Sequence, residues 1–309
     1  MKFVEICRRV FFLAAMVLML SCSGHDGEKV DKNKRKGGFI AQHVVLIGFD
    51  GWGSYCMDSV EMPHTRKLMA EGCYTLKKKA ILPSISSPNW SVLFCGAPME
   101  FVGWAANGTK PNIEQPYLNQ RGKFPSIFTI MYEQMPSSQT ICIHQWSGIQ
   151  PLIDSDVVDI CVRKGETEIT PLACNYIRTM QPELLALVYD HPDYEGHNIG
   201  HDTPEYLAKM EVLDGYVGEI VEALKQAGIY ENTIIILTSD HGGINKTHGG
   251  RTLEEMDTPF IIAGKNVRKG GEFGQPMVQY DVASTIAEIF GLKDPDCWRG
   301  KSMSHVFEK

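Results

Sequence analysis

The chain has 309 residues, of which 43% are hydrophobic and 22% charged, and its formal net charge is −7. This composition is ordinary for a globular protein, and the length is sufficient for one large domain with a full core, or for two smaller ones. The acidic balance argues against binding to a nucleic-acid polymer. A small anionic substrate stays compatible with it, because bound cations reverse the local field.

The N-terminus has the features of a bacterial export signal, predicted over residues 1–21. Basic residues precede an apolar run, residues 10–20, that is too short to span a bilayer. Cys22 directly follows Leu-Ser, which resembles a lipoprotein cleavage site; the alternative is ordinary secretion with an incidental cysteine. Residues 22–38 are polar and aperiodic and predict a flexible tether. The expected location is the periplasm or the outer membrane, with membrane contact only through an N-terminal lipid anchor.

Seven cysteines follow Cys22. An odd number leaves at least one thiol free within the chain, and the sequence alone does not predict any pairing. No two of them have the CxxC spacing, so cysteine-based zinc sites are not predicted.

Strands and helices alternate in the first half of the chain. The apolar run His43–Phe49 ends at Asp50-Gly51, as expected for a strand buried in a parallel sheet. The next predicted elements are a helix at Pro63–Glu71, a strand at Cys73–Ile81, and a helix from Ser86-Ser87-Pro88 to Cys95 that stops at Gly96. Pro88 fits the first turn of that helix. Residues 107–123 are rich in Gly, Asn, Pro and Gln and predict a long loop.

The alternation continues in the second half. Strands are predicted at Thr140–His144, Leu184–Tyr189, Thr233–Thr238 and Pro259–Ala263. The longest helix is predicted to start at Thr203-Pro204, with Thr as N-cap, and to end at Gly228; a closing helix covers Val282–Phe290. Together these elements predict an α/β fold with a mostly parallel central sheet sandwiched by helices. One catalytic domain is expected over residues 39–309, with a cap formed by residues 107–178.

Acidic and histidine residues follow three of the predicted strands. Asp50 comes after the first, Asp193 is followed by His197 four residues later, and Asp240-His241 precedes His248. The carboxyl ends of parallel strands meet at one edge of a sheet, where α/β proteins bind their ligands. Each residue alone could be a turn residue or a helix cap. The coincidence of all of them at strand ends predicts a divalent-metal site, since carboxylate and imidazole groups suit such ions.

A serine-rich segment opens the helix that ends at Cys95. Backbone N–H groups and the positive end of the helix dipole lie beside Ser86 and Ser87 there, and they favour an anionic group held against a hydroxyl. The alternative is that one of these serines only caps the helix.

These motifs, in this order, resemble the alkaline phosphatase superfamily, and within it the type I phosphodiesterase/nucleotide pyrophosphatase branch. The resemblance covers the chain from about residue 43 to the end and is weakest in the middle third. The motifs are Gly48-Phe49-Asp50-Gly51, the segment Pro83–Asn89, Pro192-Asp193-Tyr-Glu-Gly196-His197, Ser239-Asp240-His241-Gly242 and His248-Gly249. The family fold, an alkaline-phosphatase-like α/β sandwich, agrees with the predicted elements.

The resemblance implies two divalent metal ions and a nucleophile between them. One ion would be bound by Asp50, Asp240, His241 and Ser86, and the other by Asp193, His197 and His248. Ser86 would attack phosphorus and form a phosphoseryl intermediate, while Asn89 and the Ser87 N–H would contact the phosphoryl oxygens. The family usually binds zinc, although manganese or iron would accept the same Asp and His ligands.

The chain departs from related patterns in three places. The His-Gly pair common in the family after the nucleophile helix is replaced by Phe101-Val-Gly103-Trp104. Trp90 stands where the sulfatase maturation signal has an arginine, so sulfatase activity is not predicted. No arginine lies near Ser86 in sequence, and this favours a diester over the more highly charged monoester.

The predicted function is therefore hydrolysis of small phosphate esters, with nucleotides as one candidate class, by an exported phosphodiesterase or nucleotide pyrophosphatase. A phosphomonoesterase or phosphonate hydrolase of the same superfamily is the alternative. A non-catalytic protein that binds phosphate ligands is disfavoured by the complete set of ligands. A phosphoethanolamine transferase is disfavoured because such enzymes carry several membrane spans, which the sequence lacks.

Overall fold

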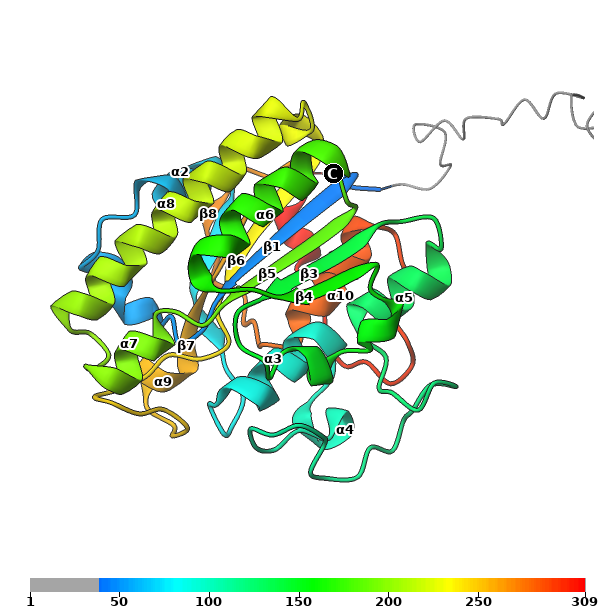
Figure 1. Cartoon of the computed structure of the whole chain (residues 1–309), viewed down its shortest axis with the longest axis horizontal. Coiled ribbons are helices and arrows are strands. Elements are labelled where there is room, and N and C mark those ends of the chain that lie inside the picture. Colours follow the sequence, from blue (N-terminus) through cyan, green and yellow to red (C-terminus); the bar gives the residue numbers. More distant parts are fainter. Residues whose placement is uncertain (1–38, 309) are drawn as a thin grey trace, which may run out of the picture. The chain divides into compact units, whose positions relative to one another are not determined.

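The computed structural model of the protein describes residues 39–308. The predicted export signal and tether lie outside the described residues. Within them, the strands form one eight-stranded sheet in the order β4-β3-β5-β1-β6-β7-β2-β8 (Figure 1). The strands are β1 His43–Phe49, β2 Cys73–Lys79, β3 Thr140–His144, β4 Ile160–Arg163, β5 Leu184–Tyr189, β6 Thr233–Thr238, β7 Asp257–Gly264 and β8 Gly271–Glu272.

The larger part of the sheet is parallel, as predicted. The five strands from β4 to β6 all run in one direction, and β1 pairs with β5 on one side and β6 on the other. Val45, for example, lies opposite both Leu185 and Ile235. Strand β7 runs antiparallel to both β6 and β2, so among the described strands β7 alone is reversed, and β2 and β8 run in the same direction as β6. The strands that carry the candidate site residues all belong to the parallel part.

Helices cover both faces of the sheet (Figure 1). Helices α2, α6 and α8 pack on one face, and α3, α5 and α10 on the other. The helices are α2 Pro63–Glu71, α3 Ser86–Cys95, α4 Met99–Val102, α5 Ile127–Gln134, α6 Glu166–Thr179, α7 Asp193–Asn198, α8 Pro204–Gln226, α9 Leu253–Met256 and α10 Asp281–Ile289. None of the helices within residues 39–308 has the length and hydrophobicity to cross a membrane.

Each face of the sheet has its own hydrophobic core. Side chains alternate along a strand, so Val44 and Leu46 of β1 join the core under α3 and α10, whereas Val45 and Ile47 join the core under α8. All four are at most 2% exposed. Burial of one such side chain contributes about 1.5–3 kcal/mol. The central strands are therefore fixed from both sides, which makes their carboxyl ends a rigid base for functional groups.

The long helix α8 forms where its N-terminal signal predicted it. The Thr203 hydroxyl accepts a hydrogen bond from the Tyr206 N–H, and Pro204 occupies the first helical position. The helix ends at Gln226, two residues before Gly228, which has a φ of +70°. Its apolar stripe is buried against the sheet, as the helical spacing requires.

The cap predicted over residues 107–178 is wrong for most of that stretch. Strands β3 and β4 belong to the central sheet, and α5 and α6 pack against it. Strand β3 lies beside β5 and β4 lies at the sheet edge, so this part of the chain completes the sandwich instead of covering it. Only the segment between α4 and α5 is an irregular loop, as predicted.

All seven cysteines of the described part are free thiols. Five of them are buried, and burial raises the pKa of the Cys56 thiol to about 12. Cys142 and Cys161 lie opposite each other on β3 and β4. The fold thus does not depend on a disulfide within residues 39–308.

Candidate metal centre

The candidate site lies at the carboxyl ends of three adjacent strands. Asp50 follows β1, Asp240 follows β6, and α7, which begins at Asp193, follows β5. Gly51 allows these groups to approach closely. Its φ is +70°, and a Cβ there would lie 2.7 Å from the Asp193 Cβ and Oδ1 atoms. The Gly51 N–H donates to Asp240 Oδ1 at 3.1 Å, which joins the end of β1 to the end of β6.

The first cluster consists of Asp50, Asp240 and His241, whose ligand atoms all lie within 4.8 Å of one another. His241 Nε2 is 3.2 Å from Asp240 Oδ2 and 3.5 Å from Asp50 Oδ1. None of the three side chains is more than 1% exposed. We call this group the buried cluster.

Two buried residues support the buried cluster from behind. The Trp90 indole N–H donates to Asp50 Oδ2 at 2.8 Å, and its ring packs so closely on β1 that a Cβ at Gly48 would lie 2.3 Å from it. The Lys78 ammonium donates to the Ser239 carbonyl at 2.8 Å and to the Gln279 side chain. Burial lowers the pKa of Lys78 to about 7, partly opposed by the carboxylate of Asp240.

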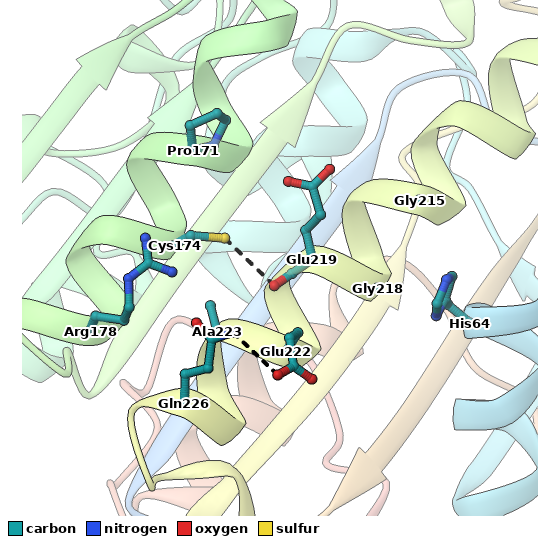
Figure 2. A pocket seen from close by; sticks show the side chains of 10 residues that line it. All are labelled: His64, Pro171, Cys174, Arg178, Gly215, Gly218, Glu219, Glu222, Ala223 and Gln226. Atoms are coloured by element: carbon teal, nitrogen blue, oxygen red, sulfur yellow. Dashed lines mark hydrogen bonds between the residues drawn. The ribbon is translucent and has the colours of Figure 1, made fainter.

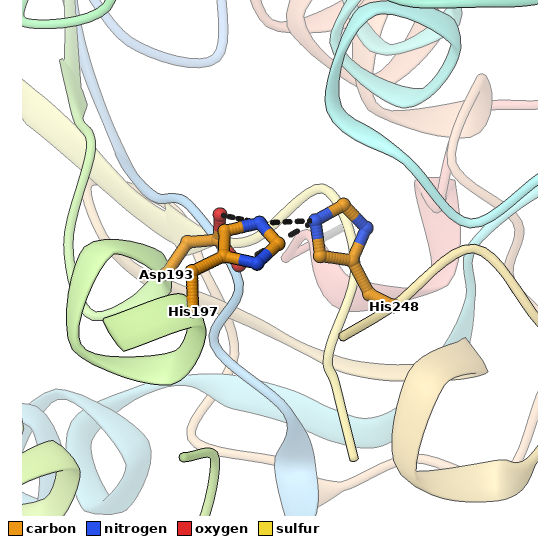
Figure 3. Close-up of side chains that lie close together, drawn as sticks. All are labelled: Asp193, His197 and His248. Atoms are coloured by element: carbon orange, nitrogen blue, oxygen red, sulfur yellow. Dashed lines mark hydrogen bonds and ion pairs between the residues drawn. The ribbon is translucent and has the colours of Figure 1, made fainter. Parts of the chain in front are cut away.

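The second cluster consists of Asp193, His197 and His248 (Figure 3). His197 Nε2 lies 3.1 Å from Asp193 Oδ2 and 3.0 Å from His248 Nε2. Asp193 and His197 are one helical turn apart on α7, so both side chains point the same way. The His197 side chain is 48% exposed, and we therefore call this group the open cluster.

The three histidines of the two clusters are oriented in the same way. Each ring places Nδ1 at hydrogen-bond distance from a main-chain carbonyl, which accepts from it. The pairs are His241 with Gly242 at 2.8 Å, His248 with Ser84 at 3.0 Å and His197 with Lys246 at 3.2 Å. A proton on Nδ1 leaves Nε2 free to face the cluster, which is how metal-bound histidines are usually held.

Several carboxylate oxygens of the clusters have no hydrogen-bond partner among the described residues. They are Asp50 Oδ1, Asp240 Oδ2 and Asp193 Oδ1. A buried anionic oxygen without a partner is costly, and a bound cation would remove that cost. The residues present therefore fit two divalent ions. The absence of cysteine from both clusters is compatible with zinc, manganese or iron.

The acidic groups of the two clusters differ in electrostatics. Burial, together with the nearby carboxylates of Asp240 and Asp193, raises the pKa of Asp50 well above its ordinary value. Burial likewise raises the pKa of Asp240 to about 7. For Asp193, burial acts in the same direction but is outweighed by the His197 hydrogen bond and the charges of nearby histidines, so its pKa falls below the ordinary range. The buried cluster thus disfavours two ionised carboxylates side by side, and either protons or a bound cation would relieve this repulsion.

Ser86 lies beside the buried cluster at the first position of α3. Its Oγ is 3.3 Å from His241 Nε2, and the residue is 6% exposed. The cap residue of α3 is Ile85, and no side chain caps the helix by a hydrogen bond. Ser86 therefore does not serve as a cap, and its hydroxyl faces the metal ligands. The Ser87 N–H, at the same helix end, donates to Asn107 Oδ1 at 2.8 Å.

The structure does not place Asn89 where the sequence prediction put it. Its side-chain oxygen accepts from the Ile81 N–H at 2.7 Å, and its amide nitrogen lies within 3.3 Å of the carbonyls of Ile81, Pro83 and Ile85. Both ends of the amide are therefore used to hold the segment before α3. Asn89 is wholly buried, and it holds the segment before α3 in place instead of facing open space.

Sequence reasoning missed three residues at the site. Asn107 reaches the Ser87 N–H from the irregular loop after α4, and Lys78 lies beneath the buried cluster. His201 lies beside Asp193, with its Nε2 3.6 Å from Asp193 Oδ1. A lysine between two other lysines at Lys77–Lys79 reads as a solvated charge run, so only the alternation of side chains along β2 could have marked Lys78 as inward-facing. Asn107 was missed because it lies in a predicted loop rich in Gly and Asn, where a single Asn gives no distinct signal.

A separate hollow of about 580 Å³ is lined by residues of α2, α6 and α8, which cover the same face of the sheet (Figure 2). Gly215 of α8 leaves open space there, whereas His64 packs directly on Gly218; Arg178, Glu219 and Glu222 are among the charged residues that line the hollow. No residue of either cluster contributes to this hollow. It is therefore distinct from the candidate metal centre.

The sheet, the helical layers and the two clusters at the strand ends define an alkaline-phosphatase-like α/β protein. A family model described as "Type I phosphodiesterase / nucleotide pyrophosphatase" matches residues 44–124 and 154–278. The chain belongs to this family, which confirms the resemblance drawn from the motifs.

Curated relatives include "Bis(5'-adenosyl)-triphosphatase ENPP4" from several vertebrates. The protein from Homo sapiens is 23% identical over 212 residues, which cover 64% of this chain and 47% of that protein. The protein from Xenopus laevis is 23% identical over 246 residues, covering 76% and 52%. The chain spans about half the length of the curated relatives it matches. A "Sulfatase" from Formosa agariphila is 33% identical, but over only 109 residues, or 34% of this chain.

Solved structures share the fold at low sequence identity. Murine "ectonucleotide pyrophosphatase / phosphodiesterase 5", in an inactive form and in complex with AMP, superposes with a TM-score of 0.71 at 16% identity, covering 86% of this chain and 100% of that one. The structure of "BT4656 in complex with its substrate D-Glucosamine-2-N, 6-O-disulfate" gives a TM-score of 0.69 at 15% identity, covering 87% of this chain and 80% of that one. These similarities confirm the predicted fold class.

Proposed function

We propose that this protein is a metal-dependent phosphodiesterase of the nucleotide pyrophosphatase type. The observation that carries the proposal is the arrangement of two Asp/His clusters beside one buried serine. Ser86 Oγ lies 3.3 Å from a ligand nitrogen of the buried cluster, and the loop that ends at Ser86 also binds the open cluster, through the Ser84 carbonyl that accepts from His248. A hydroxyl beside a cation site is suited to attack on a phosphoryl group.

The buried cluster, with Ser86, would hold one divalent ion, and the open cluster the other. Bound divalent ions supply Lewis acidity, which lowers the pKa of a hydroxyl or water and offsets charge on phosphoryl oxygens. Zinc is the ion we propose, because two carboxylate-imidazole sets without a thiolate match its common catalytic sites and the family suggests it.

In the proposed reaction the chain's own groups attack and orient the substrate. Ser86 Oγ gives up its proton and attacks phosphorus in line with the leaving oxygen; the bond from phosphorus to that oxygen breaks, and the leaving group departs as an alcohol after it takes up a proton. Water then hydrolyses the phosphoseryl ester, which releases the phosphoryl product and restores the Ser86 hydroxyl. The N-terminus of α3 faces the same place, so its N–H groups and dipole favour the anionic phosphoryl group. The Ser87 N–H donates to Asn107 in the structure, and in the complex it would donate to a phosphoryl oxygen instead.

Asn107 takes over the role that the sequence reading gave to Asn89. Its side chain already reaches the Ser87 N–H, one residue from the nucleophile, whereas the Asn89 amide is fully engaged with main-chain groups. We propose that the Asn107 amide N–H group donates to a phosphoryl oxygen. One such donor contributes a few kcal/mol, about 3, in comparable oxyanion sites.

Two arginines, Arg66 and Arg121, are bound to groups outside the site, and this favours a diester substrate. Arg66 donates to the carbonyls of Met57 and Val60, and Arg121 donates to Asp154 at 2.6 Å. These are the arginines nearest to Ser86 in sequence, and both are engaged elsewhere. A diester carries one negative charge fewer than a monoester, so it needs fewer cationic groups around the phosphate.

Nucleotides are the proposed substrate class. This part of the proposal rests on the names of similar proteins, one a bis(5'-adenosyl)-triphosphatase and another solved with AMP. The proposed location is the bacterial periplasm or outer membrane, with Cys22 as the site of lipid attachment, and it rests on the sequence of the first 38 residues.

The decisive experiment is a substrate panel with purified, zinc-loaded protein. An aryl phosphodiester, an aryl phosphomonoester, an aryl sulfate and diadenosine triphosphate are compared by kcat/KM. We expect the diester and the dinucleotide to react fastest. A clear preference for the monoester would replace the proposal with a phosphomonoesterase, and no turnover at full zinc occupancy would replace it with a binding protein.

Turnover of the aryl sulfate would also contradict the proposal, because it would indicate sulfatase activity. Sulfatase maturation needs an arginine where this chain has Trp90, and the structure buries Trp90 against β1 and bonds it to Asp50. Trp90 therefore fills a buried position that would not accommodate an arginine. Without that arginine the maturation signal is incomplete, which agrees with an unmodified serine at the site.

A further inference from the structure

His201 is a buried histidine without an assigned role. Its side chain has no exposed surface, and neither ring nitrogen has a hydrogen-bond partner among the described residues. A buried imidazole that makes no hydrogen bond loses stabilisation. Residues in this state are worth explaining, and a role beside an ion-binding site is one of the common explanations.

The position of His201 joins the two segments that carry the open cluster. Its ring lies between two glycines: a Cβ at Gly196 in α7 would lie 2.4 Å from the ring, and a Cβ at Gly243 would lie 2.3 Å from it. Its backbone N–H donates to the Asn245 carbonyl at 2.6 Å. Helix α7 carries Asp193 and His197, and the segment around Gly243 leads to His248. His201 therefore fills the space between α7 and the segment that leads to His248, and these two segments supply all three residues of the open cluster.

The ring also faces the carboxylate of the cluster. His201 Nε2 lies 3.6 Å from Asp193 Oδ1, which has no hydrogen-bond partner among the described residues, while the other oxygen faces His197 at 3.1 Å. The first distance exceeds a normal N–H···O bond by a few tenths of an ångström. Bonds of this kind at unliganded sites are often long and shorten when the ligand binds. Oδ1 also lies 3.7 Å from His248 Nε2, and its two lone pairs allow it to accept from His201 while it still faces the cluster.

We propose that His201 is a positioning residue for the open cluster: its Nε2–H donates to Asp193 Oδ1 and fixes that carboxylate for metal binding. The inference rests on the proposed function in one respect, namely that the open cluster holds a metal. Partners of this kind orient a ligating carboxylate, and their loss typically weakens metal binding about 10–100-fold. The tight contacts of Gly196 and Gly243 follow from the same role, since any side chain there would displace the ring.

The test compares two variants of nearly equal shape, His201→Gln and His201→Met. Glutamine keeps an N–H donor at about the position of Nε2, whereas methionine fills similar space without a donor. Zinc is titrated against a chelator in the full-length protein and in each variant, without substrate, and the two metal-release steps are followed separately. Cobalt substitution gives the visible spectrum of the open site as a second readout.

We expect His201→Met to shift only one of the two release steps, by about 10–100-fold, and to change the cobalt spectrum. The glutamine variant should stay within about threefold of the natural protein. Equal affinities in the two variants, or an equal loss in both, would overturn the inference, because packing alone would then explain the residue. Thermal unfolding without metal shows whether each variant is folded.

This test is independent of the substrate panel. If the natural protein hydrolyses diesters but the two variants bind zinc alike, only the role of His201 fails. If the variants differ in zinc binding but no substrate turns over, the role of His201 stands and the proposed activity fails.

Discussion

The two Asp/His clusters use the same residue types in different surroundings. The buried cluster comes from the ends of neighbouring strands β1 and β6, which are fixed by cores on both faces, and its side chains are at most 1% exposed. The open cluster comes from α7 and from the segment that leads to His248, and its His197 side chain is 48% exposed. Similar ligand chemistry is thus built once on a rigid base and once on parts that must be held in place.

The difference has an electrostatic side. In the buried cluster the carboxylates repel each other, and burial raises the pKa of Asp240 to about 7. In the open cluster Asp193 and His197 form an ion pair, and the hydrogen bond to Asp193 raises the pKa of His197 to about 9. Without metal, one cluster is therefore a source of strain and the other is satisfied by its own proton. Three predictions test this contrast.

The largest effect is expected for the residue beside the buried cluster. Ser86→Ala removes the proposed nucleophile, and we expect kcat to fall by about 10⁴-fold or more. Metal content should stay near two per chain, because the Asp and His ligands are untouched. Activity on an aryl phosphodiester and zinc content by elemental analysis provide the measurements. Ser91→Ala is the matched control, since Ser91 lies on the same helix, and its hydroxyl bonds only to the Pro88 carbonyl in the structure. Retained turnover in Ser86→Ala would remove Ser86 from the mechanism.

The second prediction compares one substitution in each cluster. Asp240→Asn and His197→Gln should each weaken one zinc site by more than about 100-fold. Without metal their effects on stability should have opposite signs. Asp240→Asn removes a repelling charge while keeping the oxygen that accepts from Gly51, so the unfolding midpoint should rise by a few degrees. His197→Gln breaks the ion pair with Asp193 and should lower the midpoint slightly.

Calorimetry with and without a chelator measures both effects. A chelator should also remove the metal of the open cluster faster than that of the buried one. If both variants lose stability equally without metal, the buried cluster is not strained and the contrast between the clusters fails.

The smallest effect is expected in the pH dependence of the open cluster. His197 has an ordinary pKa of 6.5 and a folded value of about 9, so between these values the folded state binds more protons than the unfolded state. The unfolding free energy of the metal-free protein should therefore fall through this group as pH rises from 6.5 to 9. A metal must displace the proton, so zinc affinity at this cluster should rise by about tenfold per pH unit over the same range.

Zinc titrations at several pH values check this slope. Because His197 is half exposed, added salt should reduce the shift. The His197→Gln variant should lack the slope. A flat profile in the natural protein would mean that no proton competes with the metal at His197.

The candidate ligands could be singled out from the sequence because each follows a local pattern, whereas their division into two clusters was implied by the family resemblance. Asp50 and Asp240 each follow an apolar run of strand length, and the four-residue spacing of Asp193 and His197 is that of a helix turn. The central strands were predicted for the same reason. The antiparallel pairing of β7 and the inclusion of β4 in the sheet depend on tertiary contacts, which leave no periodic signal.

The errors concern side-chain direction and long loops. Asn89 follows the predicted nucleophile by three residues, but its amide group bonds to the segment before α3. Asn107 reaches the same helix end from an irregular loop whose path no local pattern determines. His201 was overlooked because its role depends on how closely two glycines approach it, which only the folded chain shows.

The bond between Trp90 and Asp50 gives the protein an optical reporter of its own. Indole emission responds to the electric field along the ring, and a cation arriving at the Asp50 carboxyl group would change the charge nearest to the Trp90 indole. Among the described residues, the indole N–H of Trp90 is the one that donates a hydrogen bond to a carboxylate of either cluster, so within the summed emission of the five tryptophans the contribution of Trp90 would report on the buried cluster. Filling of the buried cluster can therefore be followed in real time, without a dye and without substrate.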